Sequence, residues 1–246
     1  MTKYFYITLF IISLSFCEEE KSAQDIILGS IYRLEGYNHE LSMDVSVTNS
    51  KKKNKIENVS YKISIIWNPE HLEAFKLGRI DEVSSDDGLI AWFHEYADKT
   101  MKRWVFLKDL NILKEIKNNK ANGKIDISAF ALTNDILSEE LTILGTGDIN
   151  GILCTVIEVK FKSGEIVKIW IDKDNAILHR KEYYTHSKKM YKVVSFDNIA
   201  EEGGIKYYKT GKMSDIKKNI DTVLEIKDLK KIEQYNIDFF LPKKGE

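Results

Sequence analysis

The sequence predicts a mainly β protein, a single domain built as an antiparallel barrel or a strongly curved sheet. Three observations indicate this. Apolar and polar residues alternate along most of the chain, which is typical of strands with one buried face. Turn-forming pairs such as Asn150-Gly151 separate strand-like runs at short, even intervals. The 246 residues contain two prolines and no Pro/Ser/Gly-rich linker, so a single domain accounts for the length.

The first segment has the pattern of a secretory signal. A short basic start is followed by thirteen uncharged residues, 4–16, and then by three glutamates. This run is too short to span a bilayer, which takes about 20 residues, but it fits the apolar region of a signal peptide. The alternative is a buried N-terminal strand or helix. We therefore expect a signal peptide over 1–17 and one exported domain over 18–246, with no later apolar run long enough to cross a membrane.

Two forms of the mature N-terminus are open. Ser15 and Cys17 are small residues three and one positions before a cut preceding Glu18, which would release a free exported protein. The stretch 14–17 also resembles a lipobox, in which Cys17 becomes the lipidated first residue, although Phe16 stands where a small residue is wanted. The free form is the prediction and the form anchored through Cys17 is the alternative.

The elements follow from the periodicity. A helix is expected over 22–36, because Ser22 can cap it and Ile27, Ile31 and Leu34 recur at helical spacing. Strict alternation then predicts strands at 41–48 and 59–67, joined by a lysine-rich loop. The less regular middle is assigned strands at 89–94, 104–107, 111–116 and 125–130 and a short helix at 133–140. A meander follows, with strands at 141–146, 152–161, 166–172, 176–185, 190–198, 205–213 and 221–229.

Composition and motifs point away from several functions. The net charge of −1 lacks the basic footprint of nucleic-acid binding. Two distant cysteines exclude a disulfide scaffold and a Cys-rich metal site, and Cys154 is expected to be a buried thiol. The five histidines include no close pair at metal-ligand spacing, so each is interpreted as a surface or edge residue. No catalytic constellation is present. We predict neither an enzyme nor a cofactor nor a metal.

The C-terminal half resembles a known family. Residues 168–175 with 178–184, which contain Trp170-Ile171-Asp172, look like the "W-[IV]-D" hairpin of LolA-like outer-membrane lipoprotein-sorting proteins. Similar pieces follow in order at 191–196, 204–209, 221–226 and 236–240. Upstream, 128–136 is similar to the family's S-D-F-T-x-x-D-[LI] stretch, with Ala129 in place of the acidic residue. The resemblance covers roughly 22–240. After Pro69 the family's "P…FR" strand is missing, so no gating arginine can be transferred.

The resemblance implies an incomplete, half-open antiparallel β-barrel wrapped around one or a few α-helices. It implies a non-enzymatic periplasmic carrier that shields acyl chains in an apolar cavity during transport or sorting to the outer membrane. Such shielding is needed because each acyl CH₂ exposed to water costs about 0.8 kcal/mol. The implied partners are acylated lipoproteins or lipid acyl chains, an inner-membrane release complex and an outer-membrane acceptor, and the protein is expected to be a monomer.

Two other functions are compatible with the same chain. The first is an envelope receptor or scaffold with the same barrel, anchored through lipidated Cys17. The second is an envelope hydrolase, which would need a polar cluster in the cavity, and the sequence offers no candidate for one.

The alternation also selects the residues expected to line an apolar cavity, because they share the apolar faces of the clearest strands. They are Met43, Val45, Tyr61, Ile63, Ile65, Trp67, Trp104, Phe106, Val167, Ile169, Ile171, Leu224 and Ile226. The competing interpretation is that they pack against the helix of Ile27, Ile31 and Leu34 as ordinary core. Trp170 shares its face with Lys168 and Asp172 and is not placed inside.

Overall fold

The computed structural model describes residues 21–52, 55–70, 72–85, 88–116 and 127–244. The predicted signal peptide over 1–17, Cys17 and residues 125–126 of an expected strand lie outside these ranges. The strands are β1 (His39–Asn49), β2 (Lys55–Trp67), β3 (Ala74–Glu82), β4 (Leu89–Tyr96), β5 (Met101–Leu107), β6 (Ile112–Glu115), β7 (Glu140–Ile149), β8 (Ile152–Lys160), β9 (Ile166–Asp172), β10 (Leu178–Tyr184), β11 (Met190–Glu202), β12 (Ile205–Asp215) and β13 (Ile220–Lys231). The helices are α1 (Ala23–Ile31) and the 3₁₀ turns η1 (Ser50–Lys52), η2 (Ile127–Phe130), η3 (Asn134–Ser138) and η4 (Ile237–Phe240).

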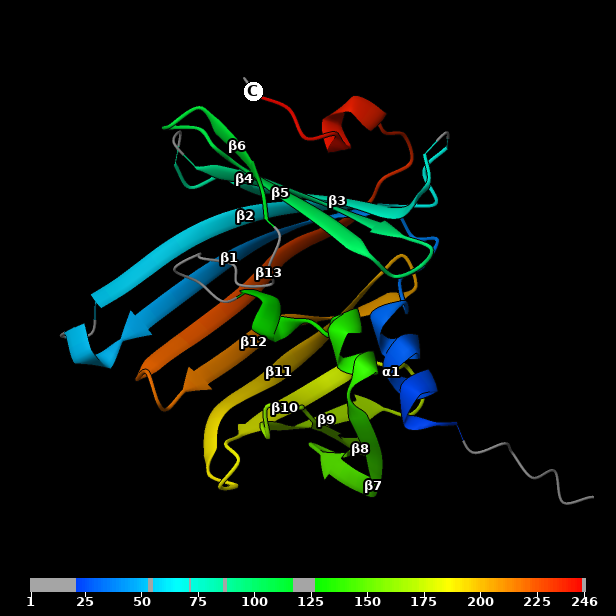
Figure 1. The fold of residues 1–246 in the computed structure, drawn as a ribbon, viewed down its shortest axis with the longest axis vertical. Helices are drawn as coiled ribbons and strands as arrows, with labels where there is room; N and C mark the ends of the chain where they lie inside the picture. Colours follow the sequence, from blue (N-terminus) through cyan, green and yellow to red (C-terminus); the bar gives the residue numbers. More distant parts are fainter. Residues whose placement is uncertain (1–20, 53–54, 71, 86–87, 117–126, 245–246) are drawn as a thin grey trace, which may run out of the picture.

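In the described residues the thirteen strands form one antiparallel sheet in the order β6-β5-β4-β3-β2-β1-β13-β12-β11-β10-β9-β8-β7. Every neighbour is the next strand in the chain except for the β1–β13 pair, which joins the two halves of the meander. The edge strands β6 and β7 do not pair with each other, so the sheet is curved but not closed (Figure 1). The predicted half-open antiparallel barrel is confirmed.

The helices lie on both sides of this sheet. Helix α1 and the green turns η2 and η3 lie inside its curve, and the red turn η4 lies outside (Figure 1). Inside, Ile27 of α1 packs with Ile157, Val159, Val167, Ile169 and Ile171 in one buried cluster. Outside, Phe240 of η4 packs on Ile66 and Leu77 of β2 and β3. The strands β2 and β3 therefore carry apolar side chains on both faces.

Three sequence-based assignments are corrected. The strand expected at 125–130 is wrong over 127–130, where the chain forms η2. Strand β3 was missed because its burial pattern does not alternate: Leu77, Gly78 and Arg79 are buried in succession. The helix expected over 22–36 is shorter, since α1 ends at Ile31. No helix in the described part of the chain is both long and apolar enough to cross a bilayer.

The surface or edge assignment of the histidines is wrong for His39, His94 and His179, which are all buried. Burial is possible because each ring finds a polar partner. His39 Nδ1 donates to the Tyr37 carbonyl at 2.7 Å, and His94 Nε2 donates to the Phe240 carbonyl at 3.0 Å. Alternation alone does not reveal such partners, because they come from segments outside the strand.

The predicted cap of the first helix is confirmed. The Asp25 amide donates to Ser22 Oγ at 3.1 Å, and the Asp25 carboxylate accepts from the Ser22 amide, which completes a capping box. We expect Ser22→Ala to lower the free energy of unfolding by about 1 kcal/mol, because one helix N–H loses its acceptor. Urea unfolding followed by circular dichroism measures this, with Ser22→Thr as the control that retains the acceptor. Equal stability of the Ala and Thr variants would contradict the assignment.

Candidate functional site

The inner face of β13, β1 and β2 brings together six of the predicted site residues. Met43 of β1 lies opposite Tyr61 of β2 and Ile226 of β13, and Val45 lies opposite Leu224. Met43, Val45, Tyr61 and Leu224 are buried in one cluster with partly buried neighbours. These six residues are Met43, Val45, Tyr61, Ile63, Leu224 and Ile226. Phe130 of η2 packs against the same cluster from inside the barrel, which shows that this face is the concave one.

The apolar face continues across β3, β4 and β5. Ile63 lies opposite Ile80, which lies opposite Ala91, which in turn lies opposite Val105. All four side chains are only partly buried, and so is the predicted site residue Ile65. Here a row of apolar side chains is left incompletely covered by the described residues. The inner apolar surface, as we name it, consists of Met43, Val45, Tyr61, Ile63, Ile65, Ile80, Ala91, Val105, Leu224 and Ile226.

The other predicted residues lie elsewhere. Val167, Ile169 and Ile171 are 4%, 1% and 0% exposed and pack beneath α1, so for them the ordinary-core interpretation holds. Trp104 and Phe106 lie on the outer face, opposite Trp92 and Ile90, in a separate cluster. The alternation correctly indicated that the residues of each strand share one face. It did not reveal which face of the sheet is concave or which part of that face a helix covers.

Trp67 lies inside but takes part in a contact between α1 and the sheet. The centroid of its ring lies 6.1 Å from that of Tyr32, the residue that follows the last turn of α1. Lys76 Nζ lies 4.8 Å from the same Trp67 ring. Trp67 is 6% exposed, so it is covered by the chain itself. It therefore does not contribute to the open part of the inner apolar surface.

Beside Trp67 a buried polar network, the Glu95 network, fastens the inner helices to the sheet. Glu95 Oε2 is 2.5 Å from Lys76 Nζ, and the two side chains are 1% and 12% exposed. Glu95 Oε1 accepts from the Tyr32 hydroxyl at 2.5 Å and from Asn134 Nδ2 at 2.6 Å. These four residues, Tyr32, Lys76, Glu95 and Asn134, connect the end of α1 and the start of η3 to β3 and β4.

The contacts of the network favour the ionised form of Glu95 although this side chain is buried. Burial opposes ionisation of Glu95, but the donors Lys76 and Tyr32 and the Lys76 charge outweigh it and lower the pKa of that carboxyl. Burial and the Glu95 contact raise the pKa of Tyr32, so the phenol keeps its proton and donates it. No sequence motif indicated this network, because its members are far apart along the chain.

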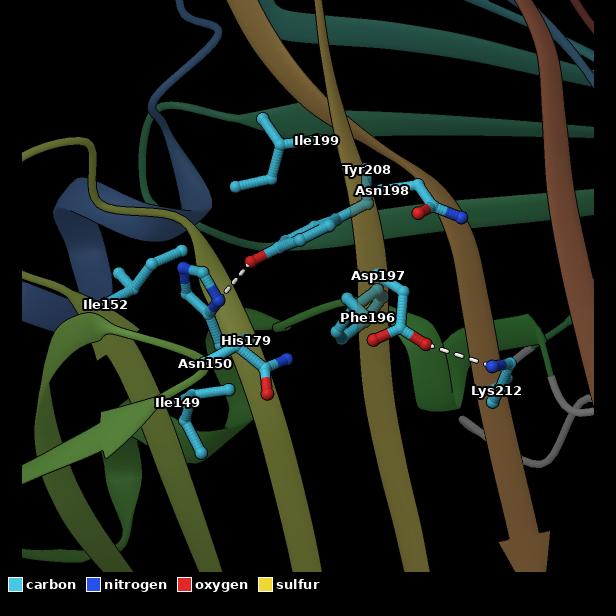
Figure 2. Close-up of a pocket in the computed structure, with 10 residues that line it drawn as sticks. All are labelled: Ile149, Asn150, Ile152, His179, Phe196, Asp197, Asn198, Ile199, Tyr208 and Lys212. Atoms are coloured by element: carbon cyan, nitrogen blue, oxygen red, sulfur yellow. Dashed lines mark hydrogen bonds and ion pairs between the residues drawn. The ribbon is translucent and has the colours of Figure 1, made fainter.

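A second set of polar side chains lines a pocket of about 370 Å³ between β10, β11, β12 and the turn from β7 to β8 (Figure 2). His179 Nδ1 is hydrogen-bonded to the Tyr208 hydroxyl, and Lys212 Nζ lies 3.0 Å from Asp197 Oδ2. Burial lowers the pKa of His179 and raises the pKa of Tyr208. Both groups are therefore uncharged at neutral pH, and the hydrogen bond joins a neutral phenol to a neutral imidazole.

Cys154, on β8, is buried as expected, and burial raises the pKa of its thiol to about 11. Because the thiolate is the reactive form, we expect the mature domain to react very slowly with a thiol reagent at pH 8 and rapidly once unfolded. Cys154 is the single cysteine of residues 18–246, so the measurement reports on it alone. Rapid reaction of the native protein would contradict the burial of this side chain.

Comparison with known proteins places these features in a fold family. A half-open antiparallel barrel curved around helices, with apolar side chains on its inner face, is the LolA-like fold. A family model described as "Uncharacterized protein" matches residues 76–244, which is more than half of the chain. The chain belongs to that family. A comparison with curated proteins gave no match.

Three solved structures share the fold over nearly the whole chain. A DUF1329 family protein from Desulfovibrio piger is 14% identical, with a TM-score of 0.74 over 89% of this chain and 95% of that one. A domain provisionally assigned as an outer membrane lipoprotein-sorting protein, from Vibrio parahaemolyticus, is 16% identical, with a TM-score of 0.71 over 89% and 97%. A LolA superfamily protein from Nitrosomonas europaea is 16% identical, with a TM-score of 0.63 over 90% and 98%.

Proposed function

We propose that the mature protein is an exported, non-enzymatic carrier that shelters acyl chains of lipoproteins or lipids on its inner apolar surface. The observation that supports this best is the partly covered row Ile63, Ile80, Ala91 and Val105 beside the buried Met43 cluster, on the concave face of an open sheet. The fold shared with the Vibrio parahaemolyticus domain that is provisionally assigned to outer membrane lipoprotein sorting supports the same class of ligand.

The energetics favour such a role. A chain that buries about ten methylenes gains roughly 8 kcal/mol in gross transfer free energy, at about 0.8 kcal/mol each. Ordering the chain and the side chains around it offsets part of this gain. The net affinity would then be moderate, which a carrier needs in order to release its cargo. The proposed route runs through the periplasm, from an inner-membrane release complex to an outer-membrane acceptor, with the carrier a monomer.

Acyl binding is tested on residues 18–246 purified from an exporting host. Native mass spectrometry should detect a bound acyl compound, and a fluorescent acyl probe should bind the delipidated protein saturably at one site. An unrelated exported β protein of similar size serves as the control. Absence of both the co-purified ligand and the probe binding would contradict the proposal.

A lipid-anchored receptor or scaffold is the second candidate, and the lipobox-like stretch ending at Cys17 favours it. The two candidates differ at the mature N-terminus. Cleavage after Cys17 leaves a free carrier, whereas acylation of Cys17 anchors the same barrel to a membrane. Labelling cells with radioactive palmitate separates them: label lost in Cys17→Ala supports the anchored form, and an unlabelled protein that begins at Glu18 supports the free carrier.

A further inference from the structure

We propose that the open edge of β7 binds an extended segment of another polypeptide as an added strand. The segment would have an uncharged middle and a lysine or arginine at each end. The site is the outward backbone edge of Glu140–Ile149. The inference goes beyond the proposed function, because it concerns a polypeptide and does not require a bound acyl chain.

The two edge strands of the sheet differ in length and charge (Figure 1). Strand β6 has four residues, and two of them, Lys114 and Glu115, are charged. Short, charged edge strands discourage further pairing. Strand β7 has ten residues, and its stretch 141–147 contains no charged residue and no proline. Strand β7 therefore lacks the side chains that usually protect an edge.

The backbone of β7 is open along its outer edge. In an antiparallel pair, the N–H and C=O groups of alternate residues point away from the neighbouring strand. Strand β7 pairs with β8 on one side, and no other strand in the described part of the chain pairs with its second side. At Gly145 an added Cβ would meet no atom within 4 Å apart from its chain neighbours. One more strand can therefore form backbone hydrogen bonds along this edge.

The exposure of the β7 side chains indicates the same. Residues 142–146 are exposed in succession, whereas exposure alternates along a strand that is packed on one face. Two of these residues are large and apolar, since Ile143 and Leu144 are 39% and 48% exposed. Side chains of an added strand would pack beside them and remove apolar surface from water.

The charges at the ends of β7 select the partner. The uncharged stretch 141–147 lies between two exposed carboxylates, Glu140 and Asp148. Antiparallel pairing with a second copy of β7 would bring Glu140 of one copy toward Asp148 of the other, and like charges on neighbouring strands are destabilising. A cation opposite each carboxylate is favourable. Strand β8 already provides one example, because Lys160 lies opposite Glu140 with its Nζ 3.4 Å from Oε2.

The shape of the edge also favours a single flexible segment. The pairing of β7 with β8 shifts by one residue between Ile143 and Gly145, which marks a β-bulge. A bulge bends its strand and increases the local twist. A flexible segment can follow that bend, whereas the rigid edge of a second sheet would have to match it. Charge and shape therefore both favour an extended peptide over a second copy of the protein.

The test uses a fluorescein-labelled peptide as long as β7, with lysine at both ends and alternating threonine and valine between them. Fluorescence anisotropy measures its binding to the mature protein, and hydrogen–deuterium exchange locates it. We expect saturable binding and slower exchange in residues 140–149. The same peptide with glutamate at both ends should bind about tenfold more weakly, because attractive contacts become repulsive. A version methylated on its backbone amides should not bind, because it has lost the donors of the added strand.

A substitution on the edge provides the second readout. Leu144→Lys should weaken binding of the lysine-ended peptide by about tenfold or more while the fold is retained, because a lysine on an edge strand hinders pairing and repels this peptide. Val223→Lys is the matched control. Val223 is 41% exposed, but its strand β13 has neighbours on both sides. This variant should bind the peptide as the wild-type protein does.

Four results would overturn the proposal. They are no saturable binding of the lysine-ended peptide, equal binding of the methylated peptide, unchanged exchange in residues 140–149, and dimerisation of the wild-type protein that Leu144→Lys abolishes. The last result would show that a second copy occupies the edge. None of the four bears on acyl binding, which is measured with the acyl probe on the same preparation, so failure of this site and failure of the proposed function are distinguishable.

Discussion

Replacement of Lys76 by methionine should lower the free energy of unfolding by about 3–5 kcal/mol, because it leaves the Glu95 carboxylate buried without its cation. Lys76 Nζ and Glu95 Oε2 are 2.5 Å apart, and the Glu95 side chain is 1% exposed. Chemical unfolding followed by tryptophan fluorescence measures the loss. Lys62→Met is the matched control, because Lys62 lies 2.9 Å from Glu40 Oε2 but both side chains are substantially exposed. The control should lose at most about 1 kcal/mol.

The pH dependence of the same variant provides a second readout. In the wild-type protein the pKa of Glu95 is below its ordinary value of 4.5, so its stabilising contribution is present above that pH. It is lost as the pH falls through the lowered, folded-state pKa. Without Lys76 the buried carboxyl should have a raised pKa, so the variant should lose stability as the pH rises through that pKa. A Lys76→Met variant as stable as Lys62→Met at pH 7 would contradict the role of the Glu95 network.

Replacement of Ile65 by glutamate should weaken binding of a fluorescent acyl probe by more than about tenfold while the fold is retained. Ile65 is on the inner face of β2 and is only partly buried, so the carboxylate can stay hydrated in the empty protein. An acyl chain on the inner apolar surface would remove that water, and the cost would appear as lost affinity. Probe fluorescence measures the affinity, and circular dichroism monitors the fold.

Ile56→Glu is the matched control for this experiment. Ile56 is on the same strand, faces the other side of the sheet and is 61% exposed. The same substitution there should leave both stability and probe binding unchanged. Equal affinity of the Ile65→Glu and Ile56→Glu variants would show that the inner face of β2 does not contact the acyl chain.

Most strands, and the grouping of several predicted residues on one face of the sheet, could be predicted from the sequence for a physical reason. Along β1 and residues 59–65 of β2 one face is apolar and the other polar, so Met43, Val45 and Tyr61 could be assigned to one surface before the structure was known. Strand β3 could not be predicted in this way. Lys76 and Gly78 face the inner side, while Leu77 and Arg79 contact the C-terminal segment on the outer side. Because neither face is exposed to solvent, the sequence shows no alternation of apolar and polar residues.

The polar networks were beyond sequence patterns altogether. Tyr32 and Glu95 are 63 residues apart and Tyr32 and Asn134 are 102 apart, so only the closure of the barrel around α1 brings them together. The misplacement of Trp104 and Phe106 has a related cause. Alternation divides a strand into two faces, but the curvature of the whole sheet decides which face is concave.

Photocrosslinking with a diazirine-bearing fatty acid would locate a bound acyl chain on the protein. The mature protein is irradiated with the probe, digested, and the modified residues are located by tandem mass spectrometry. We expect adducts on partly buried inner-face residues of β2, β3 and β13, such as Ile63, Ile65, Ile80 and Ile226, that disappear in excess palmitate. Adducts confined to outer-face residues such as Ile56 and Val223, or no competed adduct at all, would contradict an acyl-binding role for the inner apolar surface.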